Sequence, residues 1–464
     1  MTTLVYGLAV AGASTVRALR QRDVDVVVVD DEITAERRAR AAELDVELLG
    51  SLEQPALDRL VASCDLVSPS PGIPETHPVV DAARRHGVEL ASEIELAYRW
   101  EQDRVGGPRP MLAVTGTDGK TTTTLLTVDI LRAAGLRTVD AGNTSTPLVD
   151  AIDQDLDAFV VECTSFRLAW TRTFRAEAAV WLNLAPDHLN WHSSMATYEA
   201  AKARIFANQR VTDTAIGFAG DPAVMRNLEQ APGRTVSFGL DVGDYRRVVV
   251  DGQSVLTGPS GPIVAAAAMK RSLPHDMTNT LAAAALVLES GLADESAVQR
   301  AVASFTGPPH RLELVADRNG VAWFNDSKAT TPHAATAAIR SFERIVLIAG
   351  GYDKGVDLAP MAADAERVSA LIAVGVTGPQ LAEAFRRVDG RVSVEVVSDL
   401  GEAVRRAAVI ARPGDTVLLS PGCASFDQYP NFEARGDHFR TLVAELAPTT
   451  TAPEQTAPEL ESRP

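Results

Sequence analysis

The sequence predicts an α/β protein with three domains, each built around a largely parallel sheet. Its 464 residues exceed what one hydrophobic core usually supports. Short apolar runs alternate with helical patterns, an order that produces parallel sheets with right-handed crossovers. Glycine, proline and polar groups follow many of these runs, as at strand ends where open α/β sheets bind ligands. We expect domains over 1–107, 108–305 and 306–447, then a disordered Thr/Ala/Pro/Glu tail over 448–464.

The composition is that of an acidic globular protein. Hydrophobic residues make up 46% of the chain and charged residues 23%, and the formal net charge is −17. This charge argues against a general binder of nucleic acid or anionic membranes, so a polyanionic ligand would need local cations or a divalent metal. Cys64, Cys163 and Cys423 are too few and too dispersed for a disulfide framework or a Cys-x-x-Cys metal site. No apolar run reaches the length of a membrane span, and we expect a cytoplasmic protein.

The first segment has the β-α-β pattern of a Rossmann-like domain. A strand and glycine-containing turn over 4–12 precede a helical pattern, and a second strand over 24–29 ends at Asp30. Ala9 stands where the second glycine of a dinucleotide-binding loop would be. A Rossmann-like half domain without a dinucleotide is therefore the favoured interpretation.

A turn and a linker follow in the first segment. A strand runs into a Pro/Gly-rich turn over 69–74 that contains Ser70 and Gly72. Such turns lie at the carboxyl ends of parallel strands, where these sheets bind ligands. Residues 106–110, Gly-Gly-Pro-Arg-Pro, have the composition of a linker to the next domain.

Residues 111–124 predict a phosphate-binding loop between a strand and a helix. Gly116 and Gly119 allow backbone N–H groups to turn inward around an anion. Lys120 adds a full positive charge, and the Thr121 hydroxyl can hold Mg²⁺. A valine stands where the usual motif has its first glycine. An ordinary strand-to-helix turn with a surface lysine is the weaker alternative.

Polar groups follow two further strands of the central segment. Glu162 ends a strand over 158–162, where it could reach Mg²⁺; the alternative is a surface glutamate. Four groups that could bind or orient a metal follow the strand over 178–184. They are Asp187, His188, Asn190 and His192. Lys202 lies in a helical pattern, which alone predicts a solvated side chain.

The remainder of the chain holds a long helix and a second set of alternating strands and helices. Asp276 and Asn279 share a face near the start of an alanine-rich helix, where capping and ligand binding are equally good interpretations. Polar groups again follow the predicted strands of the third segment. The basic residues that could approach a phosphate across a cleft are Arg311, Lys328 and Lys354.

These features together indicate a nucleoside triphosphate bound with Mg²⁺ on the central segment. Carboxylate, imidazole and amide groups are expected near its γ-phosphate, with cations contributed by the third segment. Such an arrangement suits phosphoryl transfer followed by closure over a second substrate. The residues alone leave the acceptor open.

The chain resembles the Mur ligase family in all three segments. Residues 115–122, Thr-Gly-Thr-Asp-Gly-Lys-Thr-Thr, resemble the shortened phosphate loop of these ligases, which accounts for the missing glycine. Glu162 and His188 are similar to the magnesium-associated glutamate and histidine of the family. Lys202 is similar to the lysine that the family carbamylates, and this resemblance reverses the prediction of a solvated side chain.

Motifs of the later segments resemble the family as well. His275-Asp276-x-x-Asn279 is similar to its adenine motif, although aspartate replaces an asparagine, so Asn279 is the expected contact. Residues 307–313 resemble the motif that carries the γ-phosphate arginine. Residues 325–330, Asn-Asp-Ser-Lys-Ala-Thr, and 420–436 resemble the members that add D-glutamate.

The resemblance implies an ATP-dependent ligase of peptidoglycan precursor synthesis. It would add D-glutamate to the alanine carboxylate of UDP-N-acetylmuramoyl-L-alanine through an acyl phosphate. Two Mg²⁺ ions and a carbamylated Lys202 are implied, in a monomer that acts on small molecules without nucleic-acid or membrane partners. Rivals are a sister or folylpolyglutamate-type ligase, a phosphate-loop kinase and a nucleotide-binding regulatory paralogue; an NAD oxidoreductase is disfavoured.

The resemblance also assigns residues to each part of the site. The catalytic set is Lys120, His188, Lys202 and Arg311. The ATP set is Gly116, Thr117, Asp118, Gly119, Lys120, Thr121, Thr122, Asn279, Arg311 and Asp326. The metal set is Thr121, Glu162, His188 and Lys202, and the UDP-sugar set is Asp30, Ser70, Gly72, Asn143 and Thr164. The glutamate set is Lys328, Thr330, Lys354, Ser425 and Phe432.

Overall fold

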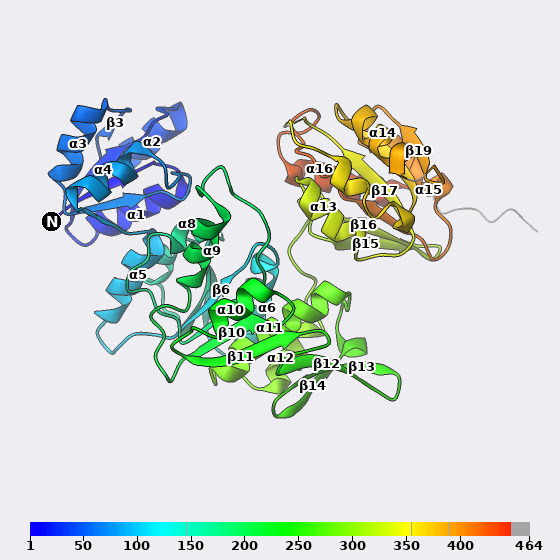
Figure 1. The fold of residues 1–464 in the computed structure, drawn as a ribbon, viewed down its shortest axis with the longest axis horizontal. Coiled ribbons are helices and arrows are strands. Elements are labelled where there is room, and N and C mark those ends of the chain that lie inside the picture. The colour runs from blue at the N-terminus through cyan, green and yellow to red at the C-terminus, as the bar shows by residue number, and fades with distance from the viewer. Residues whose placement is uncertain (145, 354, 389, 447–464) are drawn as a thin grey trace, which may run out of the picture. The chain divides into compact units, whose positions relative to one another are not determined.

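The computed structural model describes residues 1–144, 146–353, 355–388 and 390–446. The chain divides into two compact units, Met1–Thr306 and a second that starts at Gly307. The first unit contains two sheets and the second contains one (Figure 1). Each unit is described by itself below. The predicted tail over 448–464 lies outside the described residues.

The first sheet has five parallel strands in the order β3-β2-β1-β4-β5. The strands are β1 (Thr2–Tyr6), β2 (Asp25–Val29), β3 (Leu48–Leu49), β4 (Leu66–Pro69) and β5 (Glu89–Leu90). The helices are α1 (Val10–Arg20), α2 (Ala35–Glu43), α3 (Gln54–Ala62), α4 (Pro78–His86) and α5 (Glu93–Gln102). This alternation confirms the Rossmann-like prediction for the start of the chain.

The second sheet has nine strands in the order β14-β13-β12-β11-β10-β9-β6-β8-β7. They are β6 (Met111–Thr115), β7 (Thr138–Gly142), β8 (Ala158–Glu162), β9 (Ala178–Trp181), β10 (Thr214–Phe218), β11 (Arg234–Gly239), β12 (Tyr245–Val250), β13 (Gln253–Gly258) and β14 (Gly261–Ala265). Pairing is parallel from β7 to β12 and antiparallel from β12 to β14.

Helices cover the central sheet on both faces. They are α6 (Lys120–Ala133), α7 (Leu148–Ala151), α8 (Ser165–Leu168), α9 (Met195–Ala203), α10 (Pro222–Leu228), the 3-10 turn η1 (Ala266–Ala268), α11 (Pro274–Glu289) and α12 (Glu295–Val302). Leu112 and Val114 of β6 pack in a cluster with α6, α11 and α12, whereas Met111 and Ala113 pack in the opposite cluster. The phosphate-loop strand is therefore buried on both sides, as a central parallel strand requires.

The second unit holds a six-stranded sheet in the order β15-β16-β20-β17-β18-β19. The strands are β15 (Glu313–Arg318), β16 (Val321–Asn325), β17 (Ile345–Gly350), β18 (Val368–Val374), β19 (Ser393–Val396) and β20 (Thr416–Leu419). The helices are α13 (Pro332–Ile339), η2 (Ala359–Ala362), η3 (Ala365–Arg367), α14 (Gly378–Val388), α15 (Leu400–Ile410) and α16 (Phe432–Glu445). All pairings are parallel except β15 with β16, which confirms the predicted second α/β sheet.

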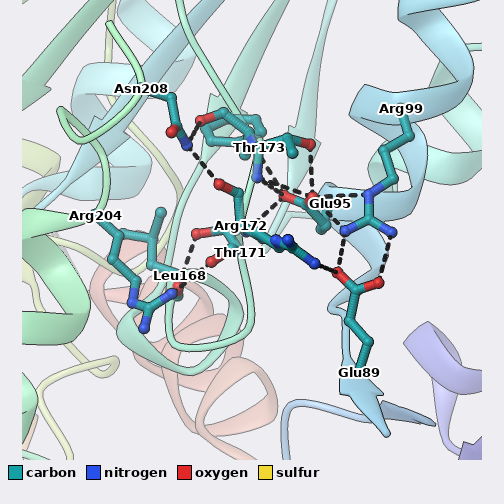
Figure 2. Close-up of polar contacts among 10 residues, drawn as sticks. Glu89, Glu95, Arg99, Leu168, Thr171, Arg172, Thr173, Arg204 and Asn208 are labelled. Carbon is teal, nitrogen blue, oxygen red and sulfur yellow. Dashed lines mark hydrogen bonds and ion pairs between the residues drawn. The ribbon is translucent and has the colours of Figure 1, made fainter. Parts of the chain in front are cut away.

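Helix α5 is fastened to the central sheet by a buried carboxylate. Glu95 is fully buried and accepts hydrogen bonds from the backbone N–H groups of Arg172, Thr173 and Phe174. Arg99, one turn later, donates to Glu95 and to Glu89, as Figure 2 shows. The loop between α8 and β9 is thus held against the last helix of the first sheet.

One helix of the central domain went unpredicted. Helix α10 connects β10 to β11. Its N-cap Asp221 accepts hydrogen bonds from two backbone N–H groups, and Pro222 occupies the first helical position, so capping rather than periodicity marked this helix.

Among the described residues, the helices are all too short or too polar to span a bilayer.

Candidate active site

The phosphate loop joins β6 to α6 as predicted. Gly116 and Gly119 have φ angles of 156° and 83°, a region that side-chain-bearing residues rarely adopt. A Cβ on Gly119 would lie 2.9 Å from Oδ1 of Asn279, and one on Gly116 would lie 2.9 Å from Cβ of Leu182. Both glycines are therefore required by the backbone conformation and by space.

Asn183, which sequence reasoning missed, holds this loop in shape. Its Oδ1 accepts hydrogen bonds from the backbone N–H groups of Thr117 at 2.9 Å and Asp118 at 2.8 Å. Its Nδ2 donates to the carbonyl of Asp118 at 3.2 Å. The signal in the sequence was a polar residue directly after the buried strand β9, where an amide can reach a neighbouring loop.

Two lysines converge on one carbonyl of the loop. Lys120 Nζ donates to the carbonyls of Gly116 at 2.9 Å and Thr117 at 2.7 Å. Lys202 Nζ, from α9, donates to the same Gly116 carbonyl at 2.6 Å. Lys120 and the N-terminus of α6 therefore make this end of the loop positive, and Lys202 places a second amine beside it.

Lys202 is buried, which overturns the solvated side chain that its helical pattern alone predicted. The residue is 1% exposed, and its ammonium lies over the ring of Tyr198 at 4.7 Å. Burial lowers the pKa of Lys202 well below its usual value, and the charge of Lys120 lowers this pKa further. The amine is consequently biased toward its neutral, nucleophilic form.

Glu162 is buried too, so the alternative of a surface glutamate is wrong. Its Oε1 accepts a hydrogen bond of 2.8 Å from Nδ2 of Asn143. Arg167 donates to Oδ1 of Asn143 at 2.7 Å and to Oε1 of Glu93 at 2.9 Å. Oε2 of Glu162 is buried without a hydrogen-bond partner among the described residues, so one carboxylate oxygen is left for a ligand.

His188 lies on the loop after β9 in a left-handed conformation, with φ of 55°. Its ring packs against Phe166 with centroids 4.6 Å apart. Burial lowers the pKa of His188, Asp187 opposes this shift, and the charges of Lys120 and Lys202 add to it. A neutral imidazole is the form that binds a metal.

His192, from the same predicted cluster, has a separate role. Its Nδ1 lies 3.2 Å from Oε2 of Glu75, and its Nε2 lies 2.9 Å from Oγ of Ser165. It is thus occupied in joining the first sheet to the central sheet. Within the part of the chain that the structure describes, no group of three or more His, Cys, Asp or Glu side chains gathers as a metal site. A metal here would need phosphate oxygens or a modified lysine to complete its ligands.

The start of α11 separates the two residues of the predicted adenine motif. Asp276 is engaged by Arg271 through two hydrogen bonds, of 2.7 and 2.5 Å, and by the backbone N–H of Leu273. Its carboxylate therefore serves the helix start. Asn279 instead faces the phosphate loop, with Oδ1 3.4 Å from Oγ1 of Thr123.

A pocket of about 460 Å³ opens between the first sheet and the central sheet. Of the predicted UDP-sugar set, Asp30, Ser70 and Gly72 line it, whereas Asn143 and Thr164 are not among its lining residues. Asp30 is already bonded to the backbone N–H of Leu8 at 2.6 Å. The remaining lining residues include Thr144, which directly follows Asn143, and Arg37 and Arg167, neither of which the sequence singled out.

The predicted γ-phosphate arginine belongs to the second unit. Arg311 lies between His310 and Leu312, which both have positive φ angles, of 60° and 42°. Asp326 accepts from the backbone N–H of Leu312 at 3.2 Å and from Oγ of Ser420 at 2.7 Å. The carboxylate of Asp326 thus helps to fix the backbone that carries Arg311.

Three of the predicted glutamate residues lie in loops that follow strands of the third sheet. Lys328 and Thr330 follow β16, and Ser425 follows β20. Phe432 begins α16, and the ammonium of Lys328 lies 5.8 Å from the centre of its ring. Lys354 lies outside the described residues.

Comparisons with known proteins agree along the whole chain. Family models match residues 1–92 (Mur ligase MurD-like, N-terminal domain), 114–287 (Mur ligase middle domain) and 310–423 (Mur ligase, glutamate ligase domain). The UDP-N-acetylmuramoylalanine–D-glutamate ligase of Frankia casuarinae is 40% identical over 455 residues, covering 96% of this chain and 94% of that protein. Its namesake from Myxococcus xanthus is 39% identical over 456 residues, covering 96% and 98%. A crystal structure of the UDP-N-acetylmuramate–alanine ligase from Thermotoga maritima shares the fold, with a TM-score of 0.57 at 18% identity over 96% of this chain and 99% of that one.

Proposed function

The chain belongs to the Mur ligase family, and from this membership we propose that it adds D-glutamate to the alanine carboxylate of UDP-N-acetylmuramoyl-L-alanine. It is an ATP-dependent amide-bond-forming ligase. Relatives that carry the D-glutamate name match nearly the full chain at about 40% identity, which supports this substrate. The reaction belongs to peptidoglycan precursor synthesis.

The positive charge at the phosphate loop, where the Lys120 ammonium meets the N-terminus of α6, carries this proposal. Transfer of a phosphoryl group to a carboxylate brings two anions together. Each pair of unit charges at about 4 Å costs roughly 4 kcal/mol at an effective dielectric of about 20. A loop with backbone N–H groups, a helix N-terminus and an adjacent lysine offsets that repulsion.

In the proposed reaction the alanine carboxylate takes the γ-phosphoryl group of ATP, which gives an acyl phosphate and ADP. The glutamate amine then attacks the acyl carbon, and inorganic phosphate leaves. Lys120 binds the transferring phosphate, and Asn183 keeps the N–H groups of Thr117 and Asp118 in position. Asn279 is the proposed adenine contact, and the remaining loop residues Gly116, Gly119, Thr121 and Thr122 surround the phosphates.

A divalent metal fits beside the loop because Glu162 presents a buried oxygen without a partner in the described structure. We propose that Thr121, Glu162, His188 and a carbamylated Lys202 hold two Mg²⁺ ions. When bound, these ions would neutralise phosphate charge and orient the γ-phosphoryl group. The buried amine of Lys202 suits carbamylation, in which neutral amine and CO₂ give a carbamate and release one proton.

The remaining substrates are assigned to the other predicted sets. The UDP-sugar occupies the pocket lined by Asp30, Ser70 and Gly72, with Asn143 and Thr164 as proposed contacts beyond its lining. Arg311 and Asp326 of the second unit are further proposed ATP contacts, with Arg311 as the proposed contact of the γ-phosphate. Glutamate binds through Lys328, Thr330, Lys354, Ser425 and Phe432.

We also propose that the protein works as a cytoplasmic monomer on small molecules, without nucleic-acid or membrane partners. The net charge of −17 supports the exclusion of polyanionic partners. The buried thiols of Cys64, Cys163 and Cys423, which form no disulfide, are compatible with a reducing compartment.

The proposed domain boundaries remain 1–107, 108–305 and 306–447. Arg109 of the predicted linker forms an ion pair with Glu101 at 2.7 Å.

One experiment tests the substrate assignment directly. The protein is incubated with ATP, Mg²⁺ and UDP-N-acetylmuramoyl-L-alanine, and with D-glutamate or L-glutamate in parallel reactions. We expect ADP, phosphate and a product heavier by one glutamyl residue in the D-glutamate reaction. A product formed only with L-glutamate or with another amino acid would assign a sister activity, and a phosphorylated acceptor would assign a kinase.

A further inference from the structure

Arg435 of the second unit is a buried cation that the proposed mechanism does not use. It lies in the first turns of α16 and is 4% exposed. Its guanidinium donates to the carbonyls of Cys423 and Ala424 at 3.1 and 3.2 Å. It also donates to Oγ and to the carbonyl of Ser327, both at 2.9 Å. All three donor nitrogens of the side chain are engaged.

These hydrogen bonds join loops at the carboxyl ends of two neighbouring strands, and a third loop packs against the same side chain. Ser327 follows β16, and Cys423 and Ala424 follow β20, which pairs with β16 on one side and β17 on the other. Gly351, after β17, leaves so little room that a Cβ there would lie 3.3 Å from a guanidinium nitrogen of Arg435. One side chain therefore sets the spacing of three loops at this edge of the sheet.

The same loops carry the proposed amino-acid site. Lys328 follows Ser327 directly, and Ser425 follows Ala424. Oγ of Ser327 donates to the carbonyl of Phe432 at 2.8 Å, which closes the connection back to the start of α16. A displacement of Arg435 would shift several proposed glutamate contacts together.

Among the residues that the structure describes, Arg435 forms no ion pair. All of its hydrogen-bond acceptors are carbonyls or a hydroxyl, and within the described residues no carboxylate lies at ion-pair distance from it. Burial lowers the pKa of Arg435 to about 10, and Asp427 acts on it only through space. The guanidinium is thus charged at neutral pH, and a buried charge without a partner is costly.

We propose that Arg435 is a positioning residue of the amino-acid site, which spaces the loops after β16 and β20 and favours substrates with a side-chain carboxylate through its unpaired charge. This inference rests on the proposed function, because it assigns a selectivity device to the same site. It predicts two separable contributions. The planar fork with five N–H groups sets loop geometry, and the positive charge sets the preference for a carboxylate over an amide.

Three variants of the full-length protein separate these contributions. R435M removes both the planar guanidinium group and its positive charge. R435K keeps a positive charge but lacks the planar guanidinium group. R406M is the control. Arg406 lies on α15 of the same unit, where it is largely exposed and paired with Glu395. For each variant, kcat and KM are measured for ATP, for UDP-N-acetylmuramoyl-L-alanine and for glutamate. The ratio of kcat/KM for glutamate to that for glutamine is measured in parallel.

We expect R435M to raise the KM for glutamate and to lower the glutamate-to-glutamine ratio, each by about tenfold, the scale of one lost charged interaction. The KM values for ATP and the nucleotide sugar should stay within about twofold of wild type. R435K should raise the KM for glutamate but keep the ratio, and R406M should match wild type. If R435M does not fold, R435Q, which also removes the charge, takes its place in every comparison.

Two results would overturn the inference. One is an R435M protein, or failing that an R435Q protein, with wild-type KM for glutamate and wild-type selectivity. The other is an equal loss toward all three substrates with reduced thermal stability, which would make Arg435 a structural staple only. A wild-type protein that prefers an amino acid without a side-chain carboxylate refutes the proposed substrate and the charge selection together. If the wild-type protein prefers glutamate but the variants give either of the first two results, the proposed substrate stands and only the role of Arg435 is refuted.

Discussion

The ammonium of Lys202 donates a 2.6 Å hydrogen bond to the carbonyl of Gly116, the first glycine of the phosphate loop. Lys120 donates to the same carbonyl from within the loop. Two cations at one buried carbonyl repel each other, and burial penalises the charged form of the inner one, so the pKa of Lys202 falls. The phosphate loop is thus bordered by an amine that is poised to lose its proton.

Replacing Lys202 with alanine should abolish most of the ligase activity. If a carbamate at this position holds the metal, short-chain carboxylates such as acetate or propionate should restore part of the rate, because they can occupy the vacated space with the same oxygen ligands. The measurement is ADP release with and without added carboxylate. Activity of the untreated wild type should also fall when bicarbonate and CO₂ are removed.

The matched control for that experiment is Lys270, a lysine of the same unit. Its side chain is exposed in the connection between η1 and α11. Lys270→Ala should keep wild-type activity and should not respond to added carboxylate. Absence of any rescue in Lys202→Ala, in a protein with an unchanged unfolding temperature, would argue against the carbamate.

Lys120→Ala should slow the reaction more than it weakens ATP binding. The lysine neutralises charge on the transferring phosphoryl group, and removal of one such contact costs on the order of 3 kcal/mol in transition-state stabilisation. That loss corresponds to about a hundredfold in kcat. Steady-state kinetics with varied ATP measure both parameters, and turnover at the wild-type rate would remove the lysine from the mechanism.

The parts of the site that could be predicted from sequence are those with local signatures. The glycines, Lys120 and the helix after them lie within a few residues of one another, and their spacing alone specifies strand, loop and helix. Glu162 likewise directly follows a buried apolar run, and the structure confirms its place at the end of β8. Such features depend on short-range backbone geometry, which sequence patterns report well.

The missed residues, and the burial of Lys202, depend on contacts that are distant in sequence. Asn183 reaches a loop more than sixty positions earlier, and Arg167 joins Glu93 to Asn143 across three elements. Lys202 has the pattern of an exposed helix face, and only the packing of α9 against the loop buries it. Arg435 lies more than a hundred positions from Ser327, so no local pattern could relate them.

Glu95→Ala should destabilise the first unit by about 3 kcal/mol or more, the cost of breaking a buried pair and leaving several donors unpaired. Burial alone would raise the pKa of Glu95, but hydrogen bonds from Thr173, Arg172 and Phe174 outweigh it and lower this pKa. The carboxylate is therefore a net stabilising anion in the native state. Urea unfolding measures the change, and Glu53→Ala, at an exposed position that makes no side-chain cap, should stay within about 0.5 kcal/mol of wild type.

His192 should make the stability of the first unit depend on pH in the mildly acidic range. Burial lowers the pKa of His192 below its usual 6.5, and this effect outweighs the opposing influence of Glu75, while His188 and Lys202 add to the lowering. The unfolded state consequently binds more protons than the folded state between the lowered pKa and 6.5. Stability therefore rises with pH across that window and is lost on acidification below about pH 6.5, by at most about 1.4 kcal/mol per pH unit for this group.

Comparison of wild type with His192→Gln isolates this contribution. Glutamine keeps a polar side chain between Glu75 and Ser165 but has no proton to gain, so the variant should lose less stability than wild type between pH 6.5 and 5. Urea unfolding followed by tryptophan fluorescence is suited to this measurement, because Trp191 adjoins the site with ring centroids 4.4 Å apart. Above about pH 7.5 neither state of His192 binds a proton, so the two stability curves should run parallel there. Glu75 does not account for a change in this range. Burial would raise the pKa of Glu75, but hydrogen bonds from Ser193 outweigh it and lower this pKa below 4.5, so Glu75 loses its contribution only at lower pH. Parallel curves across the whole range would therefore show that His192 is not the titrating group.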